Sequence, residues 1–163
     1  MAYMIWSFVL WGFVILLIPA KRIRELWPVS FISVILLLVF DFTSIHLGLY
    51  RFNDNLINIG GIPFFYLMIG AAGGLLLLYF MRRVLLYNIL IMVLYTGLLI
   101  LAEYMFIRIG AFQHLDGYNL GYSFLLTLSG VIATVLLAIG VIGKERIFSY
   151  NGEPSKISRE PKN

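Results

Sequence analysis

Two acidic residues, Asp41 and Glu103, lie inside long apolar stretches of the chain. A charged side chain is costly inside a bilayer, so it usually faces the interior of a helix bundle or a water-filled cavity. In a partly dry site a carboxyl group can act as an acid or a base, or can stabilise a cationic intermediate. The alternative is a structural role, in which each acid is hydrated or paired with Arg51 or Arg108.

A repeated pattern places the two acids in equivalent positions. The segment 41–50, Asp-Phe-x-x-Ile-His-Leu-Gly-x-Tyr, returns 62 positions later as the segment 103–112, Glu-Tyr-x-x-Ile-Arg-Ile-Gly-x-Phe. Asp54 and Asp116 align in the same register. Each copy would carry two membrane spans, so both copies would insert with the same orientation. We therefore predict a parallel repeat with its pseudo-axis along the membrane normal.

The composition excludes an ordinary soluble domain. Hydrophobic residues make up 61% of the 163 residues, charged residues 12%, and the mean hydropathy is +0.95. A bilayer core needs about 20 mostly apolar residues per helix, and the chain has five such runs: 2–18, 29–49, 63–81, 84–104 and 122–142. We expect an all-α polytopic membrane helix bundle of five transmembrane helices, in which the second and third match the fourth and fifth.

The basic residues predict the topology. Lys and Arg mark the cytoplasmic side of a membrane protein, and with five spans all of them except Arg51 and Arg108 fall on one side. The N-terminus should therefore lie outside the cell and the C-terminus in the cytoplasm. The bundle would occupy residues 1–146, and the polar segment 147–163 would be a disordered cytoplasmic tail. The partner of such a chain is the lipid bilayer, and no nucleic acid is expected.

Polar residues follow one face of two predicted helices, and each stripe ends at an acid. On a helical wheel the second helix carries such a face with Ser30, Ser33, Asp41, Ser44 and Gly48. The fourth helix carries a similar face with Asn88, Tyr95, Thr96 and Glu103. We expect the two stripes to face each other across the bundle. Further candidates for an outward-facing cavity at their ends are His46, Tyr50, Arg51, Arg108, His114, Asp116, Tyr118 and Asn119.

Neither a metal nor another cofactor is expected. The chain has no cysteine, and its two histidines are not close together in the sequence, as structural metal sites usually require. His46 lies about 140° around the helix from Asp41, so the two cannot share one helix face.

Small residues form two further stripes. Gly70 and Gly74 lie four residues apart on the third predicted helix, and Gly130, Thr134 and Ala138 do the same on the fifth. Such faces let helix backbones approach closely. They indicate either packing within the chain or an interface with a second copy or another membrane protein.

The residues around Glu103 carry a resemblance to a known family. Glu103, Ile107 and Gly110, followed by the run 116–119 and Ser123, are similar to the C-terminal half of an uncharacterised family of small multi-spanning membrane proteins. That family occurs in spore-forming Gram-positive bacteria, and the resemblance covers residues 25 to 145. Because the family has no settled activity, it implies a membrane fold and a bacterial host rather than a function.

Three functions remain open from the sequence. The first is a non-enzymatic structural or interaction component of the cell envelope. The second is an intramembrane enzyme, or a lipid- or isoprenoid-binding protein, that uses Asp41 and Glu103 in an outward-facing cavity. The third is a small transporter. A closed bundle with each acid paired to Arg51 or Arg108 would favour the first. An apolar cavity on the order of several hundred Å³, open at the outer side and lined by both carboxyl groups, would favour the second.

Overall fold

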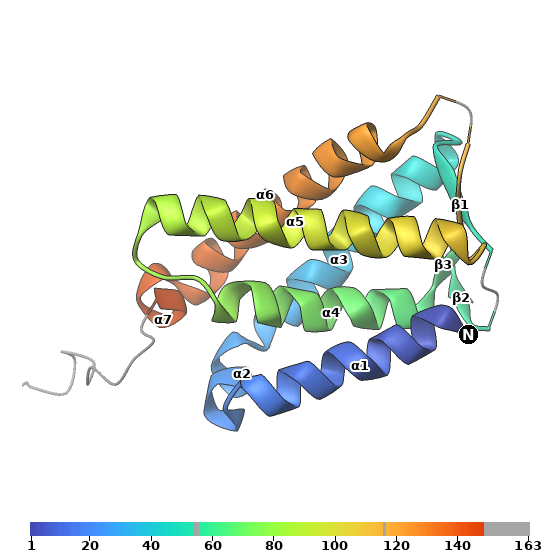
Figure 1. The fold of residues 1–163 in the computed structure, drawn as a ribbon. Coiled ribbons are helices and arrows are strands. Elements are labelled where there is room, and N and C mark those ends of the chain that lie inside the picture. The colour runs from blue at the N-terminus through green and yellow to red at the C-terminus, as the bar shows by residue number, and fades with distance from the viewer. Residues whose placement is uncertain (54–55, 116, 149–163) are drawn as a thin grey trace, which may run out of the picture.

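The computed structural model describes residues 1–53, 56–115 and 117–148 (Figure 1). Within these ranges the chain forms seven helices and two small antiparallel strand pairs. The helices are α1 (Ala2–Leu17), α2 (Ala20–Leu26), α3 (Pro28–His46), α4 (Phe64–Tyr79), α5 (Leu85–Arg108), α6 (Leu120–Ile142) and α7 (Lys144–Phe148). The strands are β1 (Tyr50–Phe52), β2 (Asn58–Ile59), β3 (Ile62–Pro63) and β4 (Phe112–His114).

Three helices, α3, α5 and α6, are each long and apolar enough to cross a membrane. The α1–α2 pair would also be long enough, but it bends by 115° at a break between the two helices. The cause is Pro19, because the residue before a proline is pushed out of the helical region, and Ile18 is indeed extended. Helix α4 is apolar but has only 16 residues. The described part of the chain is thus mostly helical, with three helices that could span a bilayer.

Helix α4 lies between α1 and α3, while α5 packs on α6 and α3 also contacts α6 (Figure 1). Two glycines of α4 allow the close approach of α3. A Cβ atom on Gly70 would lie 1.9 Å from Leu37 Cδ1, and one on Gly74 would lie 2.1 Å from Ser33 Oγ. The small-residue pair of this helix is therefore used for packing within the chain.

Helices α3 and α5 end in the same way. Gly48 and Gly110 adopt positive φ angles of 69° and 75°, which cost a glycine little because it has no Cβ. In each case the next N–H closes the helix end: Leu49 donates to the Ser44 carbonyl, and Ala111 donates to the Phe106 carbonyl. Such glycine caps are common at helix C-termini, and here each cap leads directly into a strand.

The strands that follow these caps, β1 and β4, pair with each other antiparallel. Tyr50 lies opposite His114, Arg51 opposite Gln113, and Phe52 opposite Phe112. This pairing brings together two segments that are far apart in the sequence (Figure 1).

At the opposite end of the bundle, Arg22 of α2 binds the last helix, α7. Its buried guanidinium donates to the carbonyl oxygens of Arg146, at 2.5 Å, and Ile147, and also to Glu25 at 2.9 Å. Of the predicted tail, 147–163, only Ile147 and Phe148 are described, and they belong to α7. The remainder lies outside the described residues.

Candidate functional site

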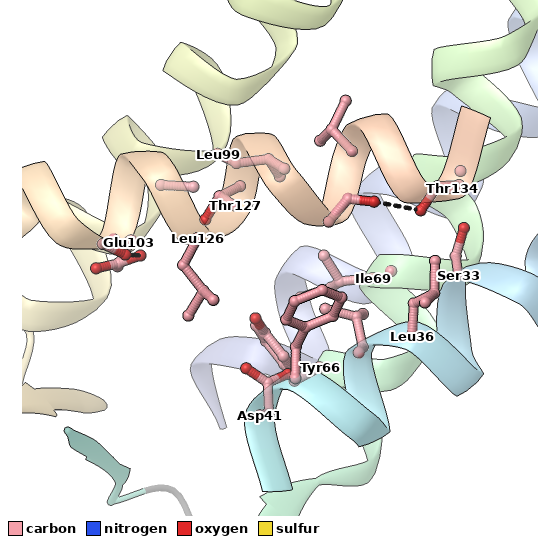
Figure 2. Close-up of a pocket in the computed structure, with 18 of the residues that line it drawn as sticks. Ser33, Leu36, Asp41, Tyr66, Ile69, Leu99, Glu103, Leu126, Thr127 and Thr134 are labelled. Atoms are coloured by element: carbon pink, nitrogen blue, oxygen red, sulfur yellow. Dashed lines mark hydrogen bonds between the residues drawn. The ribbon is translucent and has the colours of Figure 1, made fainter. Parts of the chain in front are cut away.

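A cavity of about 170 Å³ lies between α3, α4, α5 and α6 (Figure 2). Its apolar walls include Leu36, Leu37, Phe40, Ile69, Leu99, Ala102, Phe106, Phe112, Leu126 and Val131. Its polar groups are the two carboxyl groups of Asp41 and Glu103 and the hydroxyl groups of Ser33, Tyr3, Tyr50, Tyr66, Tyr95, Tyr118, Ser123, Thr127 and Thr134. The two acids that are equivalent in the repeat thus line one cavity.

Asp41 lies in the last turns of α3 and is only 5% exposed. Its Oδ1 atom accepts a hydrogen bond from the Tyr50 hydroxyl of β1. Its Oδ2 atom is buried and has no hydrogen-bond partner in the structure. Burial, together with the adjacent Asp41 carboxyl group, raises the pKa of Tyr50 above its ordinary value, so this phenol stays protonated and donates. One oxygen of Asp41 is therefore left for another donor.

Glu103 of α5, by contrast, has both carboxyl oxygens occupied. Its Oε1 atom lies 2.7 Å from Nε2 of His114 in β4, and its Oε2 atom accepts from the Ser123 hydroxyl of α6 at 2.5 Å. The Ser123 hydroxyl donates to Glu103 and not to His114. The three side chains therefore do not form the nucleophile–base–acid chain of a serine hydrolase.

Neither acid is paired with Arg51 or Arg108, the arginines that a structural role would require. Arg51 donates from Nε and Nη2 to Oε1 of Gln113, at 3.0 and 2.7 Å. The guanidinium carbon of Arg108 lies 6.0 Å from the centre of the Tyr104 ring. The cavity keeps both carboxyl groups without a neighbouring arginine among the residues that line it.

The remaining candidates divide between the cavity and other roles. His46 is exposed, with Nδ1 2.9 Å from the Phe42 carbonyl oxygen. Asn119 caps α6, because its Oδ1 accepts from the N–H groups of Gly121 and Tyr122, a common use of asparagine at a helix start. Tyr118 lines the cavity, and its hydroxyl group is buried.

Asp116 lies outside the described residues. Within the described ranges, no three His, Asp or Glu side chains group closely enough to hold a metal ion.

Several cavity residues were not expected from the sequence. Tyr3 of α1 enters from the first helix, and its hydroxyl donates to the Ala111 carbonyl at 3.3 Å. Tyr66 and Ile69 enter from α4 (Figure 2). Both helices are uniformly apolar in sequence, so no polar stripe marks the face that meets the cavity.

We found no protein-family model, no curated protein and no solved structure that matches this chain.

Proposed function

We propose that this chain is an integral membrane protein whose cavity binds a small, largely apolar molecule through a polar end. Binding sites of this kind are concave and mostly apolar, with a few polar groups that fix the ligand's orientation. The observation that carries the proposal is the free Oδ2 atom of Asp41. A buried polar atom without a partner is costly, so a ligand that donates to it would gain affinity.

The proposed membrane arrangement has five spans: the bent α1–α2 pair, α3, α4, α5 and α6. The N-terminus would lie outside and the C-terminus in the cytoplasm. The distribution of basic residues supports this orientation, since Arg22 lies at one end of the bundle and the β1–β4 pair lies at the other. Helix α4 alone would be about 24 Å long, and the buried residues Ile62 and Pro63 would extend its apolar length.

Two local features support a parallel repeat of α3–α4 and α5–α6. The caps at Gly48 and Gly110 are equivalent under the 62-residue shift. In the strand pair, Arg51 lies opposite Gln113, which is its own equivalent in the second copy. Two strands related by a two-fold axis meet in this way, with equivalent residues facing each other at the axis. The resemblance to the small membrane proteins of Gram-positive bacteria fits the same arrangement.

The contacts favour ligand binding over a purely structural role. A purely structural or interaction component was expected to pair its acids with arginines, whereas Asp41 binds Tyr50 and Glu103 binds His114 and Ser123. We propose binding because Oδ2 of Asp41 is available to a ligand's donor, whereas both oxygens of Glu103 are already occupied by Ser123 and His114.

Filling the cavity from α6 tests the proposal. A Cβ atom on Gly130 meets nothing within 4 Å, and Gly130 lines the cavity. Gly130→Leu should therefore occupy the cavity without a clash. Gly140 in the same helix also has open space at its Cβ position, but it is not part of the lining, so Gly140→Leu is a matched control.

The probe is benzyl alcohol, added to the protein purified in a neutral detergent and followed by saturation-transfer NMR. We expect the parent and Gly140→Leu to bind it equally and Gly130→Leu to bind it at least about tenfold more weakly. Equal binding by all three proteins would show that the probe enters the micelle rather than the cavity, and would overturn the proposal.

A further inference from the structure

The charged groups that line the cavity all have one sign. Asp41 and Glu103 are the charged residues among its lining, which includes no Lys and no Arg in the part of the chain described. Charges interact more strongly in a poorly solvated site than in water. When these two groups are ionised, an anion entering the cavity is repelled by both, whereas a cation is attracted by both.

The two carboxyl groups are not equally available to a ligand. Both oxygens of Glu103 already accept hydrogen bonds or an ion-pair contact, from Ser123 and His114. Asp41 keeps a buried oxygen without a partner among the described residues. On the same helix the Ser33 hydroxyl, 6% exposed, is likewise buried without a partner there. In Figure 2, Asp41 and Ser33 project from α3 toward the side of α6 that carries Leu126 and Thr134. Asp41 is therefore the group that a ligand's donor would meet directly.

Aromatic rings surround the Asp41 end of the cavity. The Tyr50 ring lies 4.9 Å from the Phe112 ring and 5.5 Å from the Tyr118 ring, measured between centroids, and all three residues line the cavity. The face of an aromatic ring attracts an ammonium group within about 6 Å. A carboxylate beside several rings is the combination that recognises amines and quaternary ammonium groups.

We infer that the polar end of the ligand is an organic cation, a protonated amine or a quaternary ammonium group, that pairs with Asp41 beside the rings of Tyr50, Phe112 and Tyr118. The apolar body of the ligand would lie between Ile69 and Leu126, deeper in the bundle. This inference rests on the proposed function and adds the chemical class of the ligand. A neutral alcohol could also donate to Asp41, but it would gain no attraction between opposite charges.

Three probes of nearly equal shape test this class: benzylamine, which is a cation at neutral pH, benzyl alcohol and benzoate. Each is titrated into the parent, Gly130→Leu, Gly140→Leu and Asp41→Asn, in a neutral detergent. We expect the parent to bind benzylamine at least about tenfold more tightly than benzyl alcohol, with benzoate weakest. Asp41→Asn should weaken the binding of benzylamine several-fold more than the binding of benzyl alcohol, so that the preference for the amine is lost.

A second variant, Tyr118→Leu, covers the case in which Asp41→Asn does not fold. It removes an aromatic ring but no charge, so it should weaken the binding of benzylamine several-fold more than the binding of benzyl alcohol. An equal loss of affinity for the two probes would contradict the inference. If the parent binds benzyl alcohol or benzoate as tightly as benzylamine, the cationic class is overturned. The cavity function survives that result as long as Gly130→Leu blocks the probe and Gly140→Leu does not. If no probe distinguishes these two variants, both proposals fail.

Discussion

Replacing Tyr50 with Phe removes the hydrogen bond that the Asp41 side chain accepts within the described structure. The hydroxyl donates to Oδ1 of Asp41, while the ring packs 4.9 Å from the Phe112 ring and 5.9 Å from the Phe52 ring, centroid to centroid. Phenylalanine keeps these ring contacts, so the substitution opens no sizeable cavity. Any loss of stability then reports the lost donor.

The magnitude follows from the burial of Asp41. Leaving a buried acceptor without its hydrogen-bond partner costs about 1–3 kcal/mol, and Asp41, at 5% exposure, cannot replace the lost donor with solvent. We therefore expect Tyr50→Phe to lower the free energy of unfolding by about 2 kcal/mol. For a chain of this size, that corresponds to a melting temperature about 4–8 °C lower.

The assay is thermal unfolding in a neutral detergent, followed by near-ultraviolet circular dichroism. Tyr122→Phe is the control, because Tyr122 is 59% exposed in α6 and the loss of an exposed hydroxyl should change stability by less than about 0.5 kcal/mol. A double-mutant cycle with Asp41→Asn should show coupling of about 1 kcal/mol or more. The dependence of Asp41 on this donor is refuted if Tyr50→Phe has the same melting temperature as the parent, or if Tyr122→Phe lowers the melting temperature by as much.

Two further predictions concern the packing of α4 and the topology. Gly74→Ala should lower the melting temperature, because its Cβ atom would lie 2.1 Å from a side-chain oxygen of α3, and overpacking typically costs about 1–3 kcal/mol. Gly97→Ala in α5, where a Cβ atom meets nothing within 4 Å, should leave the melting temperature unchanged or raise it. A lower melting temperature for Gly97→Ala than for Gly74→Ala would contradict the packing of α4 on α3. Because the chain has no cysteine, Arg51→Cys and Lys144→Cys can be labelled in intact cells without background. An impermeant maleimide should react with the first and spare the second, and labelling of the second alone would invert the proposed topology.

Helical periodicity alone predicts part of the cavity lining. It places Ser33, Asp41 and Ser44 on one face of the second predicted helix. All three are buried, and Ser33 and Asp41 line the cavity. It also places His46 away from that face, and His46 is exposed. These predictions succeed because a face of a regular helix depends only on the spacing of residues along it.

The partners of the two acids could not be predicted in the same way. Tyr50 and His114 reach Asp41 and Glu103 from β1 and β4, and the pairing of these strands depends on the distance between helix ends, which no local pattern encodes. For Asn88, the helical wheel predicts a place on the polar face that the structure does not use. This residue shares a wheel face with Glu103, but it lies at the start of α5 and is used there to bind the backbone of Arg82.

The bent first span also lies beyond what the sequence pattern predicts. The run 2–18 and its end at Pro19 stand out as a stretch of apolar residues. The short helix α2 that follows, and the contact of its Arg22 with α7, arise from packing between the two ends of the chain. Basic residues near a membrane boundary usually indicate orientation alone, so nothing in the sequence distinguishes the buried Arg22 from its exposed neighbours.

The most direct test of ligand binding in the cavity is to locate a bound probe. Crystals of the parent grown from a lipid phase would be soaked with para-bromobenzylamine, and the bromine would be found by anomalous diffraction. We expect a bromine peak among Ile69, Leu126 and Thr134, with the amine directed at Asp41, and no such peak in crystals of Gly130→Leu. Bromine peaks confined to the lipid-facing surface of the helices would contradict the existence of a binding site between α3 and α6.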